Sequence, residues 1–304
     1  MGQALHLGPS LTLKANPKLS FRKGTYSYTV ETHGDQSSYT VSDGARTLSI
    51  PIRWTFGLGA QTWVLEREGK LYESMVSYYP SIAGLAITTG DEGLTPTSLD
   101  EAMGRELTQK DSQACFGCHA SNAVTAGKVN LNSLQPGVTC EHCHAGSNAH
   151  AIDALGGSLE YTPPDIRKLS SEDVSHFCGQ CHRTWDFVVR NRWRGEVNVR
   201  FQPYRLANSK CFDGTDRRIS CLACHDPHQD LVRQDSSYDG KCLACHATSA
   251  KSAPPTAPAS VESCPVAKEN CVSCHMPKVK LPGGLMTFTD HQIRVVKPGD
   301  SYPN

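Results

Sequence analysis

One short arrangement of nucleophilic and metal-binding side chains, Cys-x-x-Cys-His, occurs six times between residues 115 and 275. With 14 Cys and 13 His among 304 residues, roughly 0.03 copies would be expected by chance, so the repetition indicates a motif. The cysteine pairs are Cys115 and Cys118, Cys140 and Cys143, Cys178 and Cys181, Cys221 and Cys224, Cys242 and Cys245, and Cys271 and Cys274. The histidines that follow them are His119, His144, His182, His225, His246 and His275.

The spacing suits covalent attachment of a porphyrin. Two thiols separated by two residues can form thioethers with the vinyl groups on one edge of the ring. The next residue then lies under the ring, where its imidazole can bind iron as the proximal ligand. We therefore predict six covalently bound haem c groups. Zinc is the alternative, because Cys-x-x-Cys pairs also build zinc ribbons, but a ribbon does not require a histidine directly after the second cysteine.

Each iron has a sixth position, and its occupant decides between electron transfer and catalysis. Six of the 13 histidines follow cysteine pairs, which leaves seven for six irons. We predict mostly bis-histidine haems, with an open sixth position as the alternative. The distal candidates are His150, His228, His291, His176, His33 and His6; His142 lies inside the second pair and is a weaker candidate. Met75, Met103, Met276 and Met286 are better explained by core packing.

The composition limits the possible partners and compartment. The 30 basic and 30 acidic residues balance, and haem propionates would add negative charge, so nucleic-acid binding is not expected. No apolar run reaches the roughly 18–20 residues of a membrane span. Covalent haem attachment takes place outside the cytoplasm, so we predict a periplasmic or extracellular protein, although residues 1–10 do not form a signal peptide. Disulfides persist in such compartments, and the two remaining cysteines, Cys211 and Cys264, are expected to pair.

The order of residue patterns divides the chain into three segments. Residues 1–20 have the character of an extended arm. Residues 21–96 contain no cysteine and alternate apolar and polar residues between turn signals such as Asp43-Gly44, which predicts about five antiparallel strands. Pro51 predicts an edge strand or a bulge. Residues 97–304 form the predicted multihaem domain, which begins with a helix capped by Thr97 or Ser98 and continuing to Leu107. The predicted fold is mainly short α-helices and loops wrapped around a stacked multihaem core, with a small N-terminal antiparallel β subdomain.

Several of these motifs resemble one known family. Residues 115–119 and the run Gly137-Val-Thr-Cys-Glu-His-Cys-His-Ala-Gly-Ser-Asn-Ala-His150 are similar to the cytochrome c554 family, with Ala145-Gly146 where the family has Gly-Pro. Residues 221–228 and 271–291 resemble the C-terminal half of large bacterial multihaem proteins, so the resemblance covers about residues 115–295. It implies stacked and perpendicular bis-histidine haems, as in the wider nitrite reductase and hydroxylamine oxidoreductase group, with His150, His228 and His291 at distal positions. It also suggests a signal peptide, and a seventh haem motif as a further hypothesis, upstream of Met1.

These observations predict an electron-transfer protein whose partners are other cytochromes or a membrane quinol oxidoreductase. One alternative is an oxidoreductase in which one open iron acts on a small nitrogen or sulfur compound. The sequence lacks a Cys-x-x-Cys-Lys motif like that of nitrite reductase, which disfavours this alternative. A further alternative is a subunit of a respiratory complex or of a self-assembled cytochrome filament.

Overall fold

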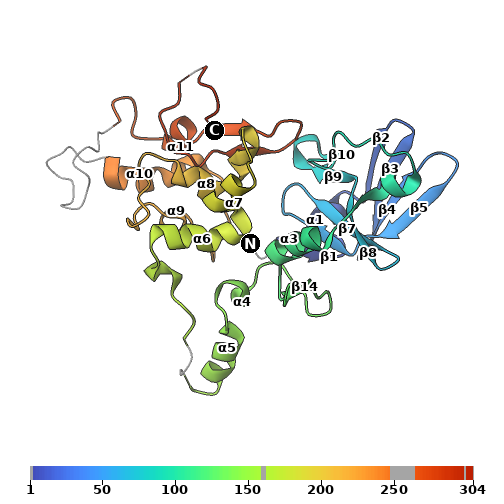
Figure 1. Cartoon of the computed structure of the whole chain (residues 1–304), viewed down its shortest axis with the longest axis horizontal. Coiled ribbons are helices and arrows are strands. Elements are labelled where there is room, and N and C mark those ends of the chain that lie inside the picture. Colours follow the sequence, from blue (N-terminus) through green and yellow to red (C-terminus); the bar gives the residue numbers. More distant parts are fainter. Residues whose placement is uncertain (1–2, 159–161, 247–263, 298, 304) are drawn as a thin grey trace. The chain divides into compact units, whose positions relative to one another are not determined.

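The computed structural model describes residues 3–158, 162–246, 264–297 and 299–303. The chain divides into two compact units. Unit 1 comprises residues 1–164 and 283–286, and unit 2 comprises residues 165–282 and 287–304. Figure 1 labels their helices and strands, and each unit is described by itself. None of the described helices combines the length and the apolar composition that a bilayer crossing needs.

A four-stranded antiparallel sheet in unit 1 follows the alternating sequence pattern. Its strands are β2 (Lys18–Lys23), β3 (Tyr26–His33), β4 (Gln36–Ser42) and β5 (Thr47–Pro51), in that order. Gly24, Gly34 and Gly44 lie in the connecting turns with positive φ angles of 60°, 60° and 91°, which glycine adopts without steric cost. Pro51 ends β5, an edge strand, which confirms the expectation for this proline.

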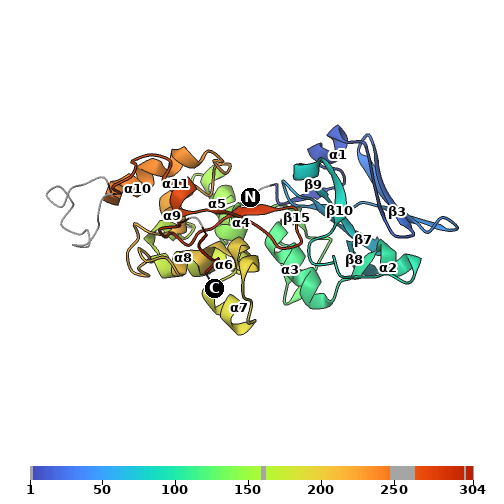
Figure 2. The ribbon, with the colours of Figure 1, turned by 90° about the horizontal axis from the view of Figure 1, so that it is seen from above.

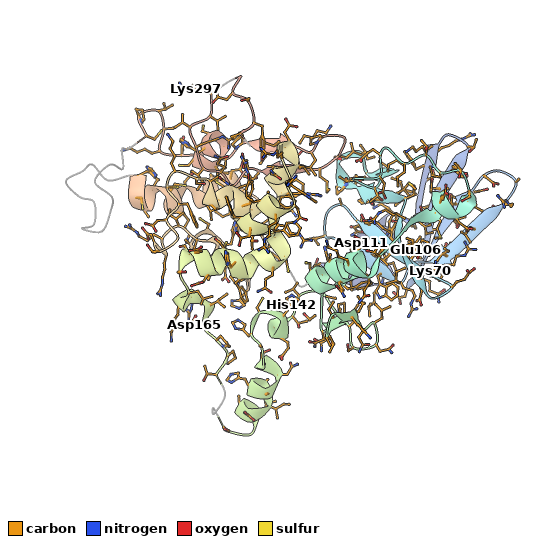
Figure 3. The ribbon with its side chains drawn as sticks, viewed as in Figure 1. Lys70, Glu106, Asp111, His142, Asp165 and Lys297 are labelled. Atoms are coloured by element: carbon orange, nitrogen blue, oxygen red, sulfur yellow. The ribbon has the colours of Figure 1, made fainter. Side chains whose placement is uncertain are left out.

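A second sheet has five strands in the order β1-β6-β7-β8-β11. These strands are β1 (Leu5–Leu7), β6 (Trp54–Phe56), β7 (Thr62–Arg67), β8 (Lys70–Ser74) and β11 (Gly104–Glu106). A separate hairpin contains β9 (Val76–Tyr79) and β10 (Gly84–Ile87). Lys70 on β8 and Glu106 on β11, both labelled in Figure 3, form an ion pair at 3.0 Å across the edge of the five-stranded sheet.

Unit 1 has a substantial apolar core. One cluster joins the inner face of the four-stranded sheet, including Tyr28 and Tyr39, to Trp63 on β7 and to Met103, the last residue of α2 (Leu99–Met103). A second cluster packs Trp54 and Phe56 against other buried side chains. The buried residues of the second cluster are Leu5, Trp54, Phe56, Val64, Leu107, Phe116, Ala120 and Ala123. Because burial of each large apolar side chain contributes about 1.5–3 kcal/mol, this unit has a core built from its own residues.

The helices of unit 1 are short and capped. They are α1 (Leu11–Ala15), α2 (Leu99–Met103), α3 (Gln109–His119), α4 (Cys140–Cys143) and α5 (Ser147–Leu155). Ser98 caps α2, as expected, but this helix ends at Met103, and the residues that follow form β11. Thr108 and Asp111 then form a capping box that begins α3. The short pairs β12 (Ala120–Ser121) with β15 (Gln135–Pro136) and β13 (Val124–Thr125) with β14 (Lys128–Val129) follow α3.

Unit 2 is mainly helical. Its helices are α6 (Ser171–His182), α7 (Trp185–Arg190), α8 (Gln202–Ala207), α9 (Cys221–Cys224), α10 (Asp239–His246) and α11 (Cys271–His275), with 3-10 turns at Ile166–Lys168, Glu196–Arg200 and Asp235–Tyr238. Strands β16 (Lys278–Lys280) and β17 (Thr287–Thr289) pair near its end. Helices α6, α7 and α8 pack together (Figure 2). Among its described residues, the apolar cluster consists of Val188, Phe201 and Tyr204, with Phe187 packed against them.

The predicted fold class is wrong for the chain as a whole. Of the residues that the structure describes, 32% are helical and 25% lie in strands. The strands form two sizeable sheets with their own core. The alternating segments extend from residue 5 to residue 106 and bury large aromatic side chains. The β structure is therefore a major part of the chain and not a small addition to a helical wrapping.

Asp91 should make the stability of unit 1 depend on pH. Burial and the nearby Glu73 raise the pKa of Asp91 to about 6, so the native state holds a proton that the unfolded state releases near pH 4. Stability from this group is therefore present below about pH 4 and is lost as pH rises to about 6, by roughly 3 kcal/mol. Urea unfolding followed by circular dichroism should show this loss in the wild type and not in Asp91→Asn. The exposed Glu68 in the turn between β7 and β8 provides the control: Glu68→Gln should keep the wild-type slope, and equal slopes in all three proteins would contradict the prediction.

Candidate haem sites

All six cysteine pairs lie on a turn of helix. The first, third, fifth and sixth pairs end α3, α6, α10 and α11, and the second and fourth pairs form α4 and α9. In a helix, residues three and four positions apart share a face, so the two thiols and the following histidine project to the same side. In α4 and α9 the backbone N–H of His144 donates to Cys140 O at 2.7 Å and that of His225 to Cys221 O at 2.9 Å. This local geometry is the one that thioether attachment and proximal ligation require.

The cysteines are accessible. Each of the 14 cysteines is half-buried or exposed, although cysteine is usually among the most buried residue types. The disulfide expected between Cys211 and Cys264 is not seen. In the described part of the chain, no group of three or more His, Cys, Asp or Glu side chains could hold one metal ion. The zinc alternative, which needs four convergent ligands in a structural site, therefore gains no support.

Four proximal histidines are held by their Nδ1 atoms. His119 Nδ1 donates to Ala4 O at 2.9 Å, His144 Nδ1 to Pro164 O at 3.2 Å, and His275 Nδ1 to Arg294 O at 2.9 Å. His182 Nδ1 donates to the side-chain oxygen of Gln202 at 3.2 Å.

These acceptors determine which nitrogen of each neutral ring carries the proton. A carbonyl oxygen can only accept, so the proton lies on Nδ1 and the neutral ring carries its lone pair on Nε2. This is the hydrogen-bond pattern of histidines that ligate metals. The residues therefore fit a haem iron at Nε2.

The His225 and His291 rings lie close together, at a separation that two ligands of one iron would have. Their ring centres are 6.2 Å apart, with an angle of 39° between the ring planes. Two imidazoles that bind one metal from opposite sides, with bonds of about 2.0 Å and ring centres about 1.1 Å beyond each nitrogen, would have their centres about 6.2 Å apart. Burial lowers the pKa of His291 to about 4, so its ring is neutral near pH 7, the form that binds metal. His291 Nδ1 donates to Thr289 O at 3.0 Å.

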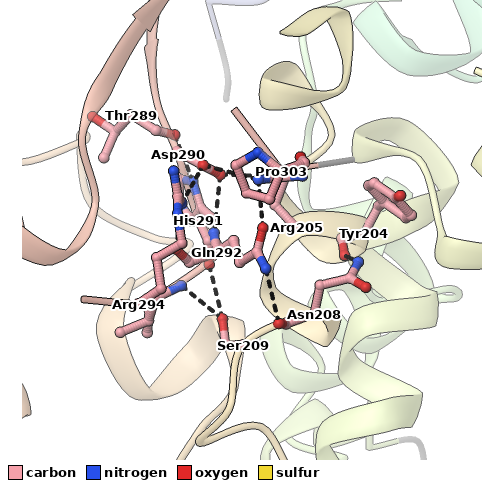
Figure 4. Close-up of polar contacts among 11 residues, drawn as sticks. Tyr204, Arg205, Asn208, Ser209, Thr289, Asp290, His291, Gln292, Arg294 and Pro303 are labelled. Atoms are coloured by element: carbon pink, nitrogen blue, oxygen red, sulfur yellow. Dashed lines mark hydrogen bonds and ion pairs between the residues drawn. The ribbon is translucent and has the colours of Figure 1, made fainter. Parts of the chain in front are cut away.

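A buried ion pair holds the segment that carries His291 (Figure 4). The Arg205 and Asp290 side chains are both fully buried, and Arg205 Nε and Nη2 donate to the two Asp290 oxygens at 2.8 and 2.9 Å. Arg205 also donates to Gln292 Oε1 at 2.6 Å and to Pro303 O at 3.0 Å, and it lies 4.5 Å from the centre of the Tyr302 ring.

Asp290 also receives hydrogen bonds from outside this pair. Arg294 Nη1 donates to Asp290 Oδ2 at 2.6 Å, and the backbone N–H of Gln292 donates to Oδ1 at 3.0 Å. Burial tends to raise the pKa of Asp290, but these hydrogen bonds and the nearby charges lower it, so the carboxylate is ionised at neutral pH.

Neighbouring pairs in unit 2 also meet through their thiols. The side chains of Cys178 and Cys221 are in hydrogen-bond contact, as are those of Cys242 and Cys271. The third pair therefore lies beside the fourth, and the fifth beside the sixth. Porphyrins attached at these thiols would have their edges close together.

The other distal candidates lie elsewhere in their units. His228 is exposed in the loop after α9, with Nδ1 3.4 Å from Asp226. His150 lies half-buried on α5 and His176 lies exposed on α6. His33 is exposed at the end of β3, opposite Gln36. His6 lies half-buried on β1, opposite Thr55, and His142 lies on α4, where Figure 3 labels it.

Sequence reasoning did not find the residues that hold the histidines. Ala4 is 115 positions from His119, Gln202 is 20 from His182, and Arg205 is 85 from Asp290. None of them belongs to a motif. Only an indirect signal for Arg205 exists in the sequence. It is a charged residue within a mostly apolar segment, Gln202–Ala207, and a charge that is buried with such a helix needs a partner of opposite charge.

Part of the chain matches one known protein family. Residues 92–145 match the family described as cytochrome c554 and c-prime. This segment contains α2, α3 and the first two cysteine pairs, so it starts before the region in which the sequence motifs showed the resemblance and ends before His150. Neither the curated proteins nor the solved structures contain a match. The resemblance to this family is therefore confirmed over residues 92–145, and it supports a c-type cytochrome with covalently bound haem.

Breaking the Arg205–Asp290 pair should lower the free energy of unfolding far more than breaking an exposed ion pair. Replacing Asp290 with Ala leaves the Arg205 charge buried without its partner, and the expected loss of unfolding free energy is about 3–5 kcal/mol. The control is Asp186→Ala, which removes an exposed partner of Arg190 at 3.7 Å and should cost less than about 1 kcal/mol. Urea unfolding of the purified protein measures both. Similar small losses in the two variants would refute a central role for the buried pair.

Proposed function

We propose that this chain is an extracytoplasmic hexahaem c-type cytochrome that passes electrons along a chain of mostly bis-histidine haems. The closeness of the His225 and His291 rings carries the proposal, because the 6.2 Å separation of their centres suits two ligands of one iron. Further support comes from the match of residues 92–145 to a cytochrome family. Its redox partners would be other cytochromes or a membrane quinol oxidoreductase.

The residues of this chain would each have a defined task. Bound haem supplies an iron that gains or loses one electron at a time. The twelve paired thiols would attach the porphyrins, and the six adjoining histidines would supply one iron-binding nitrogen each. Carbonyl groups such as Ala4 O and Arg294 O keep the histidine Nδ1 atoms protonated and so direct Nε2 towards iron. His291 would be the second ligand of the iron bound by His225, and His150, His228, His176, His33 and His6 are proposed for the other irons.

The contacts between thiols suggest a route for the electrons. Cys178 touches Cys221, and Cys242 touches Cys271, so the third and fourth haems, and the fifth and sixth, would be neighbours. A reduced haem makes reduction of its neighbour less favourable by charge repulsion. The small apolar cluster of unit 2 also fits this proposal, because a bound prosthetic group stabilises the folded state by linkage.

Counting haem tests the attachment sites. The purified, exported protein should contain six haems by the pyridine haemochrome assay, and Cys221→Ser/Cys224→Ser should contain five. Cys211→Ser/Cys264→Ser is the matched control, because it removes two cysteines that belong to no pair, and it should keep six. A full complement in the first variant, or none in the wild type, would show that the pairs do not attach haem.

Replacing His291 tests the proposed axial pair. Loss of its Nε2 should leave one of the six irons five-coordinate, because no other ligand holds that position. Electron paramagnetic resonance of oxidised His291→Ala should therefore gain a high-spin signal from one haem, and the reduced variant should bind carbon monoxide. His142→Ala, which removes a histidine of the second pair's loop, should keep the wild-type low-spin spectrum. An unchanged spectrum in His291→Ala would show that His291 does not bind iron. A high-spin haem in the wild type that binds nitrite or hydroxylamine would instead favour the alternative function, an oxidoreductase with one open iron.

A further inference from the structure

An unusual concentration of arginine surrounds α7. Residues 183–200 contain five arginines and two acidic residues, in a chain whose 30 basic and 30 acidic residues balance overall. We call these five arginines the arginine face: Arg183, Arg190, Arg192, Arg194 and Arg200. Their segment follows the third cysteine pair directly, because α6 ends at His182.

The charges of the arginine face are poorly neutralised. Within the described residues, the ion pair formed here joins Arg190 to Asp186 at 3.7 Å, and both side chains are exposed. Arg183 lies over the Phe187 ring at 4.5 Å, and Arg200 lies 5.2 Å from the ring centres of Trp193 and Phe201. Arg200 Nε is buried without a hydrogen-bond partner, and burial together with the charge of Arg183 lowers the pKa of Arg200. An anion brought here would therefore be stabilised.

A cavity opens within this face. It has a volume of about 290 Å³, and its lining residues offer hydrogen-bond donors and no carboxylate: Gly179, Gln180, Arg183, Thr184, Phe187, Arg190 and Asn191. On α6, Gly179 and Gln180 lie about 100° and 200° around the helix from Cys178, whereas Cys181 returns to within about 60° of it. The cavity therefore lies on the side of α6 away from the thiols, where the haem of the third pair would not fill it.

Apolar side chains accompany the arginines. Trp185 and Val189 are four positions apart on α7, so they share a face, and they are 47% and 46% exposed. Trp193 packs against Phe187 with ring centres 6.2 Å apart and remains 36% exposed. Tryptophan and arginine are enriched at the centres of protein interfaces. The combination suits a small, electrostatically guided contact of the kind that redox partners make.

We propose that the arginine face docks an acidic electron-transfer protein, with a partner carboxylate entering the cavity beside Arg183 and Arg190. This inference rests on the proposed function, because it names the surface through which electrons reach the third haem. In each encounter one electron leaves the partner's cofactor, and one haem iron changes from ferric to ferrous. The basic and acidic residues of the chain balance, and haem propionates would add negative charge, so attraction of an acidic partner must come from this local excess of arginine.

The rate of reduction by an acidic probe tests the docking surface. The probe is reduced flavodoxin, an acidic flavin protein, mixed with the oxidised holoprotein in a stopped-flow instrument. Arg192→Glu/Arg194→Glu should slow the second-order rate about ten-fold at low salt. The difference should disappear near 1 M salt, where charges are screened beyond about 3 Å. Arg233→Glu/Lys268→Glu, which reverses two exposed charges elsewhere in unit 2, should stay near the wild-type rate and salt dependence.

Other outcomes would overturn the proposal, each for a different reason. Equal slowing in both double variants would mean that net charge, and not this face, guides the probe. If the arginines bind haem propionates instead, Arg183→Gln/Arg200→Gln would lower a haem potential and Arg192→Glu/Arg194→Glu would leave the flavodoxin rate unchanged. A wild-type dimer that Arg192→Glu/Arg194→Glu dissociates on size exclusion would identify a second copy as the occupant. Failure of dithionite to reduce the wild-type haems would instead remove the proposed function itself.

Discussion

The buried pair of Arg205 and Asp290 is the interaction on which the arrangement of unit 2 depends. Two fully buried charges are stable only when hydrogen bonds satisfy them, and here both partners have several. Asp290 fixes the backbone beside His291, and Arg294, which also binds Asp290, carries the carbonyl that accepts from His275. Gln202, on the same helix as Arg205, accepts from His182. The short helix α8 is thus connected through these contacts to three candidate iron ligands, His182, His275 and His291.

The two units are stabilised in different ways. Unit 1 packs two sheets and α2 around aromatic and aliphatic side chains such as Tyr39, Trp63 and Met103, so its first two cysteine pairs are attached to a self-sufficient scaffold. In the described part of unit 2, the apolar cluster is limited to the neighbourhood of Val188, Phe201 and Tyr204. The buried ion pair and the proposed haems would supply there what apolar packing supplies in unit 1.

Local patterns predicted local structure well. The alternation around Tyr28 and Tyr39, with glycine turns between, indicated the strands of the four-stranded sheet because side chains alternate across a strand. Ser98 marked the start of α2 because its hydroxyl accepts from the Glu101 backbone. The end of that helix was missed, because Gly104 is a poor helix former and pairing of β11 with β8 outweighs the helix propensity of Arg105 and Glu106. The overall fold class was wrong because the extent of the β structure was underestimated.

The sequence by itself determined which cysteines form pairs and which histidine follows each pair, and from these it predicted the attachment chemistry. These properties are local, because they depend on residues within five positions of one another. Only the tertiary structure decided that the His291 ring lies 6.2 Å from the His225 ring, that Arg205 neutralises Asp290, and that Ala4 O holds His119. Those contacts join residues 66 to 115 positions apart, and no local preference of the chain encodes which distant partner a buried imidazole or carboxylate will meet.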